Sequence, residues 1–519
     1  MIGKIKASST AKSGLVVMFS TLFSRLLGFV RIAVVASFFG ASGAADVLNA
    51  VFTIPNNLRK LMAEGALSSA FIPELTKSHI IDPEGYRARK TVRLLFTFQI
   101  IILIPLVILS IIFAKPVIDI LLEFRESEKM QLAVSLFRFF IPYVLLVSIS
   151  AILMGVLNSH SKFFVPAITP ILFSISVITC IFVFSSRLGV YSMALGVLAG
   201  GVLQIVFQLP SVIRKGYSFL PDLEFSYPPF RQILRLWYPI ALTSLISVVS
   251  QQVAFLLASG LSDGSTSALA NAIVFWQLPF GIFSTSISTV FFPRMAENIQ
   301  KENAVELKKT IEQGLIFILF FLLPAGIAMW ILAPHIISAA LQRGNFTAEN
   351  TIIASTVLRG YLPGMIFLGG YNFLQRLFYS SGDSKTPFKI LTMVAILDIA
   401  LSIMMINIGF GVLSLAVAHS ISYFIGFIIL FTKARKIASF LIEKDSIITL
   451  IKIIVVNLVF VFFAVLSYRL LDDKWKDGSS FFYFFAVMSM VIFLVILILF
   501  LYWRAGVTKR VFASVKRQL

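Results

Sequence analysis

Three arginines interrupt otherwise apolar segments near the start of the sequence. Arg25 and Arg31 lie in the apolar stretch 14–39, and Arg59 follows Pro55 in the next one. A charged residue at the centre of a bilayer costs roughly 2.5–3.5 kcal/mol on insertion scales, so such residues usually face a wet cavity or a partner. Guanidinium groups bind phosphate oxygens in pairs, and more strongly away from water. The three arginines therefore predict a cavity inside a membrane that holds a phosphate-bearing anion. The alternative is that their long side chains reach to the membrane interface instead.

Two residues near these arginines could change the direction of the helices that carry them. Arg25 and Arg31 are about 240° apart around an ideal helix, so they do not share one face of a straight helix. Gly28 lies between them and permits a bend that would bring them together. Pro55 should break or kink the second helix just before Arg59. We therefore expect Gly28 and Pro55 to act as hinges.

Charged side chains close to the arginines are candidates for gating. Asp46 opens the second apolar segment, Lys60 adjoins Arg59, and Glu64 lies beyond Pro55. Either carboxylate could hold an arginine in place while cargo is absent and then release it. The alternative for Asp46 is structural, because a carboxylate at the start of a helix favours the positive end of the helix dipole.

Another carboxylate lies far along the chain. Asp398 is the only acidic residue deep in the apolar segment 387–408. An isolated buried acid is either protonated or bound to a cation, unless it serves only as a structural hydrogen-bond partner. Asp398 is therefore a candidate ion site, with Na⁺ or H⁺ as the coupling ion. The membrane potential alone is the alternative source of energy.

The residues needed for enzymatic or cofactor chemistry are not gathered anywhere in the sequence. There is no Gly-rich Lys-Ser/Thr loop for ATP, and no His/Cys cluster has the spacing of a metal site. The four histidines are scattered singly, and the one cysteine, Cys180, allows no intramolecular disulfide. We expect no catalytic residue, no metal and no cofactor.

The composition is typical of a membrane protein. Of the 519 residues, 58% are hydrophobic and 13% are charged, and the mean hydropathy is +0.94. A net charge of +20 in a soluble protein would suggest nucleic acid, but here the basic residues lie mostly in short connections between apolar runs. Runs near the ~20 residues that span a bilayer, without strict alternation, predict helices rather than a barrel. We expect fourteen helices, at approximately 13–39, 45–69, 92–113, 132–157, 166–184, 189–211, 232–258, 267–292, 312–333, 353–379, 387–408, 411–432, 448–470 and 481–503.

The distribution of basic residues predicts the orientation. If the connections alternate from a cytoplasmic N-terminus, most Lys and Arg residues fall on the cytoplasmic side, as the positive-inside rule requires. The first run contains arginines and lacks a small-residue cleavage site, so we expect no cleavable signal peptide. Both termini should be cytoplasmic. The outside connections then carry only Lys115, Arg125, Lys129, Arg187, Arg343, Lys474 and Lys476.

The sequence also contains an internal repeat. Arg138-Phe-Phe-Ile-Pro142 and the later Pro166 match Arg359-Gly-Tyr-Leu-Pro363 and Pro387, at an offset of 221 residues. Two copies of an even-helix unit have the same orientation in a membrane, and such duplications are typical of transporters with a site between the halves. We expect a six-helix bundle over 1–215, a second over 216–436, and a two-helix appendix over 437–519.

Four stretches of the sequence resemble a known family. Residues 19–75 read FSTLFSRLLGFVRIAVVASFFGASGAADVLNAVFTIPNNLRKLMAEGALSSAFIPEL, which is similar to the N-terminal signature of the MurJ (MviN) lipid II flippases. The block IPYVLLVSISAILMGVLNSHSKFFVPAITP (141–170) resembles that family's counterpart. So do RGNFTAENTIIASTVLRGYLPG (343–364) and LQRLFYSSGDSKTP (374–387). The resemblance extends over both halves of the chain.

The resemblance implies a fold, a cargo and a set of site residues. The fold is that of the multidrug/oligosaccharidyl-lipid/polysaccharide (MOP) exporter superfamily: two pseudo-symmetric six-helix bundles, two extra C-terminal helices, and alternating access through a central cationic cavity. The cargo is lipid II, the undecaprenyl-diphosphate-linked peptidoglycan precursor, moved from the inner to the outer leaflet of the bacterial cytoplasmic membrane. The implied state is a monomer among membrane lipids, with the cell-wall synthesis machinery as a partner. The family's cavity arginines correspond to Arg25, Arg31 and Arg59, and its acidic positions to Asp46 and Glu64.

The sequence departs from the family pattern at two positions. The family commonly has an arginine in helix 8, shortly before a proline, where this sequence has Val274. Family members often carry an aspartate at the position of Ile32. The second half therefore contributes less charge to the expected cavity, which puts a symmetric arginine clamp in doubt.

Several functions remain open beside lipid II flipping. The nearest is a flippase for another undecaprenyl-diphosphate-linked glycan, or a MATE-like antiporter. An exporter of cationic drugs should have a carboxylate-rich cavity, whereas arginines dominate here. A membrane-embedded enzyme acting on lipid diphosphates would need acid/base or metal-binding residues clustered at one membrane face. A scaffold of the cell-wall machinery would tolerate changes at Arg25.

Overall fold

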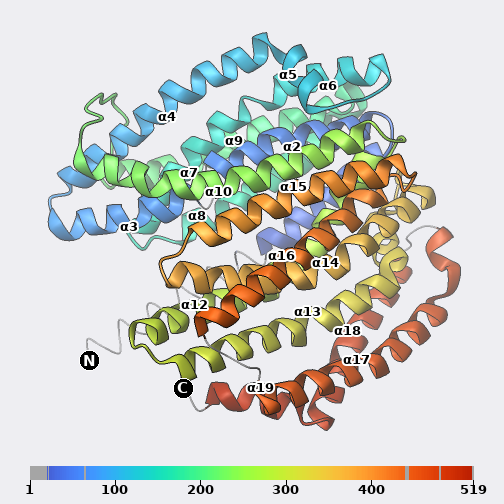
Figure 1. Cartoon of the computed structure of the whole chain (residues 1–519). Coiled ribbons are helices and arrows are strands. Elements are labelled where there is room, and N and C mark those ends of the chain that lie inside the picture. Colours follow the sequence, from blue (N-terminus) through green and yellow to red (C-terminus); the bar gives the residue numbers. More distant parts are fainter. Residues whose placement is uncertain (1–19, 21–22, 63–65, 439–442, 478–480, 517–519) are drawn as a thin grey trace. The chain divides into compact units, whose positions relative to one another are not determined.

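The computed structural model describes residues 20, 23–62, 66–438, 443–477 and 481–516 (Figure 1). Over these residues the chain forms helices and no strand. Twelve helices in this part are long and apolar enough to cross a membrane. The predicted all-α, polytopic membrane architecture is therefore confirmed. The chain divides into two compact units, Met1–Gly260 (unit 1) and Leu261–Leu519 (unit 2).

The predicted count of fourteen spans stays a prediction. The twelve candidate spans match the third to fourteenth predicted segments, some of them lengthened. The first predicted segment, 13–39, is described as helix over 23–39, and its beginning lies largely outside the described residues. The second, 45–69, coincides with α2 (Ala44–Met62) and the start of α3 (Ala66–Ile81), and residues 63–65 between them lie outside the described part.

Glycines with left-handed backbone separate the first two helices of unit 1. Gly40 and Gly43 have φ angles of 77° and 58°, which side-chain-bearing residues rarely adopt. The helix over 23–39 therefore stops here, and α2 begins at Ala44. The helices that follow are α4 (Tyr86–Ile112), α5 (Ala114–Leu121), α6 (Ser127–Phe140), α7 (Tyr143–Ser159), α8 (Phe164–Leu188), α9 (Tyr191–Ile213) and α10 (Pro228–Ser259).

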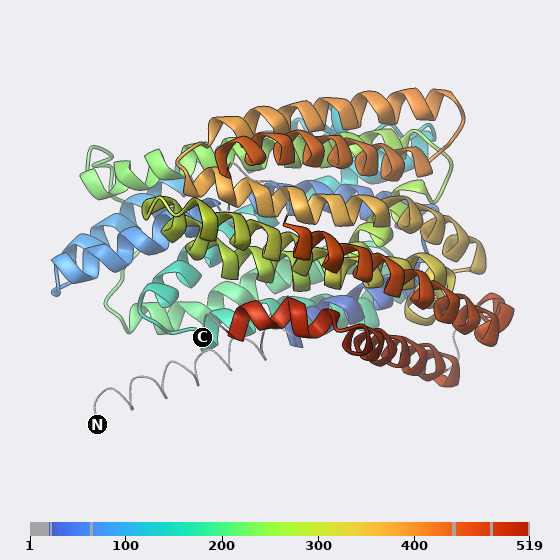
Figure 2. The ribbon, with the colours of Figure 1, turned by 60° about the horizontal axis from the view of Figure 1, so that its bottom comes forward.

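Unit 2 begins with a span that Pro279 interrupts. α11 (Ser265–Pro279) passes into the π-helical turn η1 (Phe280–Ser284) and then into α12 (Thr285–Gln300), as expected where a proline removes a helical hydrogen bond. Figure 2 shows the short α19 leading to the C-terminus. The remaining elements are α13 (Ala304–Leu341), α14 (Ala348–Ser380), α15 (Lys385–Asn407), α16 (Leu413–Ala438), α17 (Lys444–Leu471), η2 (Asp472–Asp477), α18 (Phe481–Arg504) and α19 (Val507–Lys516).

The boundary between the compact units differs from the boundary of the sequence repeat. α10, the seventh predicted span, packs against α2, α3 and α4 and so belongs to unit 1. The units reflect packing, whereas the parts 1–215, 216–436 and 437–519 rest on the internal repeat. The three repeat-based parts stay a prediction.

Two glycines on α9 allow a close approach of α8. A Cβ atom on Gly196 would lie 2.7 Å from the Val177 Cα, and one on Gly200 would lie 3.2 Å from the Phe173 Cα. Small residues four positions apart let membrane helices pack with their backbones in contact. The Ser176 hydroxyl also donates to the Gly196 carbonyl (2.9 Å). This contact fixes Phe173, which is part of the cavity described below.

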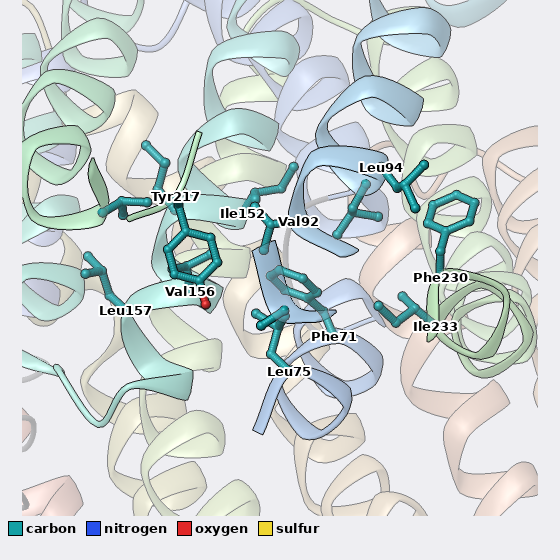
Figure 3. Close-up of a cluster of buried hydrophobic side chains, with 14 of the residues drawn as sticks. Phe71, Leu75, Val92, Leu94, Ile152, Val156, Leu157, Tyr217, Phe230 and Ile233 are labelled. Atoms are coloured by element: carbon teal, nitrogen blue, oxygen red, sulfur yellow. The ribbon is translucent and has the colours of Figure 1, made fainter. Parts of the chain in front are cut away.

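A buried apolar cluster joins α3, α4, α7 and α10 (Figure 3). Tyr217, in the connection before α10, is part of it, and its hydroxyl lies 3.2 Å from Nε2 of both His79 and His160. The two imidazole rings are 4.4 Å apart. A hydroxyl can donate to one ring nitrogen and accept from the other, so this bridge requires at least one neutral histidine. The other members of the apolar cluster that Figure 3 labels are Phe71, Leu75, Val92, Leu94, Ile152, Val156, Leu157, Phe230 and Ile233.

The close contact of α8 and α9 leads to a prediction for Gly196→Ala. The added methyl group meets the backbone of Val177, so overpacking should lower the free energy of unfolding by about 1–3 kcal/mol. Gly326→Ala is the control, because its Cβ would make only ordinary contact, 3.5 Å from the Met365 Cε. Thermal unfolding in detergent should show a lower midpoint for Gly196→Ala alone. Equal midpoints for the two variants would contradict the contact.

The His79–Tyr217–His160 bridge leads to a prediction about pH. Burial, with the neighbouring charges of His79 and Lys215, lowers the pKa of His160 from 6.5 to about 4, and burial also lowers the pKa of His79. Below pH 6.5 the unfolded chain therefore binds more protons than the folded chain. The contribution to stability is complete above pH 6.5 and is lost as the pH falls towards about 4.

The measurement is the midpoint of thermal unfolding across this pH range, for the wild type and His160→Gln. The wild type should lose stability on acidification more steeply than the variant, which cannot take up the proton. Parallel pH dependences would contradict a role for His160 in acid sensitivity.

Candidate binding cavity

Five helices of unit 1 enclose a cavity of about 390 Å³. It lies among the helix over 23–39, α2, α7, α8 and α9. A volume of this size is within the range of small-ligand sites. The lining residues are Ser24, Gly28, Arg31, Phe52, Asn56, Arg59, Tyr143, Val147, Ser150, Ala151, Met154, Thr169, Pro170, Phe173, Ser174 and Gln204.

Two of the three predicted arginines line this cavity together. The Arg31 guanidinium carbon lies 5.1 Å from the centre of the Phe173 ring, within the range of a cation–π contact. The Arg59 Nε donates to the Asn56 Oδ1 (3.1 Å), one helical turn earlier on α2. The charges of Arg31 and Arg59 interact unfavourably with each other. The cavity therefore concentrates positive charge at a place where an anion would relieve the repulsion.

The rest of the lining supplies neutral polar groups. Ser150, Thr169, Ser174 and Gln204 line the cavity, and all four are buried. The Gln204 Nε2 reaches the Thr169 carbonyl at 3.5 Å. Sequence reasoning missed these four residues and Tyr143. The sequence feature that could have indicated them is the presence of polar side chains inside otherwise apolar spans. That feature is weak evidence by itself, because serine and threonine can form hydrogen bonds to backbone carbonyl groups of their own helix.

Among the described residues that line the cavity, none is an aspartate or a glutamate. Within the described part of unit 1, this cavity therefore has two guanidinium groups, several hydroxyl and amide groups, and no acidic counter-charge on its wall. Such a lining suits an anion with several acceptor oxygens. It does not suit a cationic ligand.

Arg25 occupies a different position from Arg31. Its side chain is exposed, and it is not among the lining residues, although the adjacent Ser24 is. The helix over 23–39 is uninterrupted at Gly28, and α2 continues through Pro55. The predicted hinge role of Gly28 and Pro55 concerns motion between states and stays a prediction. Gly28 does line the cavity, and within the described part of the chain a Cβ added there would meet no atom within 4 Å beyond its neighbours and its own helix backbone.

Two of the predicted gating residues, Asp46 and Lys60, are not among the residues that line the cavity. Asp46 is buried in the first turn of α2, with 2% of its surface exposed. The Lys60 Nζ donates to the Gln251 Oε1 of α10 (3.0 Å), so it joins α2 to α10. Asn57 supports the same junction through the Gln252 Oε1 (3.5 Å). Glu64 lies outside the described residues.

Two further predicted positions lie in unit 2. Asp398 on α15 accepts from, or pairs with, the His419 imidazole on α16, with 3.3 Å between Oδ2 and Nδ1. Val274, where the family pattern has an arginine, lies half-buried in α11. The buried polar residue nearest to it on that helix is Asn271.

The sequence matches a family model over most of its length. Residues 35–513 match the model described as "Lipid II flippase MurJ". A "Probable lipid II flippase MurJ" from Borreliella burgdorferi is 37% identical over 502 residues, which cover 96% of this chain and 97% of that protein. A protein of the same name from Buchnera aphidicola is 31% identical over 465 residues, which cover 88% of this chain and 90% of that protein.

Solved structures agree with the sequence match. A lipid II flippase MurJ in an inward closed conformation has a TM-score of 0.77 at 27% identity, covering 94% of this chain and 99% of that one. An inward-facing MATE-family transporter of the MOP superfamily has a TM-score of 0.66 at 14% identity, and the match covers 82% of this chain and 98% of that one. This likeness shows a shared fold. These relatives are transporters rather than enzymes. The chain belongs to the MurJ family of lipid II flippases.

Proposed function

We propose that this protein flips lipid II from the inner to the outer leaflet of the bacterial cytoplasmic membrane. The observation that carries the proposal is the pairing of Arg31 and Arg59 in one cavity, where the lining residues that the structure describes include no acid. A lipid-linked diphosphate carries about two negative charges and many acceptor oxygens, which two guanidinium forks can bind. The family name of the relatives supplies the identity of the cargo.

The cavity avoids the main physical barrier to flipping. A sugar–diphosphate headgroup crossing bare hydrocarbon would lose its hydrogen bonds to water, which costs several kcal/mol for each unsatisfied polar group. Ser150, Thr169, Ser174 and Gln204 offer replacements for those bonds. The polyprenyl tail stays in lipid throughout the cycle. Alternating exposure of the cavity to the two sides then moves the headgroup.

Other parts of the proposal concern the cycle and the orientation. Arg25 takes part in capturing the headgroup at another stage, and Asp46, Glu64 and Lys60 exchange partners as the cavity opens and closes. Gly28 and Pro55 accommodate the bending. Both termini are cytoplasmic, because the basic residues concentrate in the connections on that side. A coupling ion bound at Asp398, or the membrane potential, resets the cavity.

The cavity leads to a prediction for Arg31→Ala and Arg59→Ala. Each change removes charge-assisted hydrogen bonds to the diphosphate, worth about 1.5–3 kcal/mol, so flipping should slow by about 10- to 100-fold. The measurement is twofold: rescue of a bacterium depleted of its own lipid II flippase, and flipping of fluorescent lipid II in proteoliposomes. Arg31→Lys keeps the charge but not the planar fork, and should be intermediate.

Arg187→Ala is the matched control for the arginine variants. Arg187 is exposed in the last turn of α8, a helix that contributes to the cavity wall, and it is not a lining residue. It should rescue growth as the wild type does. Full rescue by Arg31→Ala and Arg59→Ala, at normal protein levels, would reject the proposed role of the cavity.

A further inference from the structure

Unit 2 contains a groove of about 530 Å³ among α13, α14 and α16, with α14 packed against both of its neighbours (Figure 1). All three helices belong to candidate membrane spans, so the groove lies where lipid is the surrounding solvent. Its wall is mostly apolar, and among the described residues that line it Arg359 alone carries a charge. No part of the function proposed above uses this groove.

The groove is as long as one leaflet of a membrane. On α14 its wall runs from Thr356 to Phe367, and on α16 it runs from Leu413 to Phe424. Each of these stretches rises roughly 16 Å, at 1.5 Å per residue. The hydrocarbon of one leaflet is about 15 Å thick, which is half of the bilayer core. The length of the groove therefore matches a single acyl chain that extends through one leaflet.

Arg359 lies near one end of the groove and is held by the backbone of α13. Pro334 has no N–H, so the Trp330 carbonyl, one helical turn earlier, lacks its usual helical donor. The Arg359 Nε donates to that carbonyl (2.9 Å), and the guanidinium carbon lies 5.7 Å from the centre of the Trp330 ring. These two contacts fix the guanidinium group at this end of the groove.

The contact with α13 uses only part of the guanidinium group. Nε carries one of its N–H donors, and the two terminal nitrogens carry the others. Within the described part of the chain, Arg359 pairs with no carboxylate. Guanidinium nitrogens bind phosphate oxygens in a planar fork, and more strongly away from water. The arginine and the apolar wall together therefore suit a phosphate group with a long hydrocarbon chain.

Close packing of α14 on α16 shapes the floor of the groove. A Cβ on Gly360 would lie 2.7 Å from the Ala416 Cβ, so no larger residue fits there. The Ser420 hydroxyl accepts from the Gly364 N–H (3.0 Å) and donates to the Gly360 carbonyl (2.6 Å), the two groups that an ideal helix would join directly. Contacts between helix backbones thus set the floor, and the groove is part of the fold.

We propose that this groove binds one anionic phospholipid. Its phosphate accepts hydrogen bonds from the terminal nitrogens of Arg359, and one acyl chain lies along the apolar wall. A zwitterionic headgroup would bring an ammonium group next to Arg359, and none of the described lining residues is an acid that could pair with it. Phosphatidylglycerol brings only the charge of the phosphate. With the orientation proposed above, the Arg359 end faces the outer surface, so the lipid belongs to the outer leaflet.

The test uses Trp330 as a fluorescent reporter, because it lines the groove and is 51% exposed. Full-length protein is placed in phosphatidylcholine nanodiscs with increasing amounts of brominated phosphatidylglycerol or brominated phosphatidylcholine, and subtraction of the Trp330→Phe signal isolates Trp330. In the wild type, brominated phosphatidylglycerol should quench Trp330 at about 10- to 100-fold lower mole fraction, because of its charge-assisted hydrogen bonds to Arg359. Quenching at equal fractions would overturn the site and leave bulk lipid or a partner helix as the occupant.

Variants of the arginine and of the apolar wall test the two parts of the site separately. Arg359→Gln should abolish the preference for phosphatidylglycerol, and Arg359→Lys, which keeps the charge but not the planar fork, should retain part of it. Ile421→Phe leaves the arginine unchanged and fills part of the groove, so quenching should need more phosphatidylglycerol.

Arg469→Gln is the matched control for these variants. Arg469 is exposed in the last turn of α17 and is not a lining residue, so its replacement should leave the preference unchanged. A preference that survives in both Arg359→Gln and Ile421→Phe would overturn the site. So would its loss in Arg469→Gln, since any surface arginine would then have the same effect.

The polyprenyl tail of lipid II is the competing occupant of the groove. If the groove holds a phospholipid, one molecule of unlabelled lipid II per protein should leave the quenching of Trp330 unchanged. Relief of the quenching at this ratio would assign the groove to the cargo and overturn the phospholipid site. The site involves no residue of the arginine cavity, and no readout here requires transport. Failure of this inference therefore leaves the flippase function standing, and failure of the flippase function leaves this test valid.

Discussion

The structure of unit 1 depends on keeping two guanidinium groups together inside a membrane-spanning bundle. Arg31 and Arg59 line one cavity and repel each other, and no acidic residue is among the side chains of the described part of the chain that line it. Neutral groups contact both arginines: the Phe173 ring lies against Arg31, and the Asn56 amide accepts a hydrogen bond from Arg59. An anion with several acceptor oxygens would add charge-assisted hydrogen bonds and relieve the repulsion between the two guanidinium groups.

Close contacts between helix backbones hold the important side chains in both units. In unit 1, Gly196 and Gly200 bring α9 against α8 and so fix Phe173 in the cavity wall. In unit 2, Gly360 and Gly364 bring α14 against α16 next to His419. Inside lipid there is no hydrophobic force between helices, so small residues that allow close packing take over this role. The position of each functional group is therefore set largely by residues that have no chemistry of their own.

The sequence predicted the helical membrane fold and the two cavity arginines, because charged residues inside long apolar runs are unusual enough to be read directly. The sequence did not show that Arg31 lines the cavity whereas Arg25 does not, because this difference depends on which face of the first helix meets α7 and α8. It missed the pairing of Asp398 with His419 for a similar reason. The two residues lie on different helices, and only the packing of α15 on α16 brings them together. The neutral polar lining was equally hidden, because serine and threonine are common in membrane helices.

The most direct test of the central claim asks whether the arginine cavity is wet and binds the diphosphate. Ser174 lines the cavity and is buried, and Cys180 can be replaced by serine to give a background without cysteine. In that background, Ser174→Cys should react with a charged, water-soluble thiol reagent in proteoliposomes, and lipid II should slow the reaction in a manner that requires Arg31 and Arg59. A Ser174→Cys protein that resists the reagent, or one that lipid II does not protect, would contradict the account.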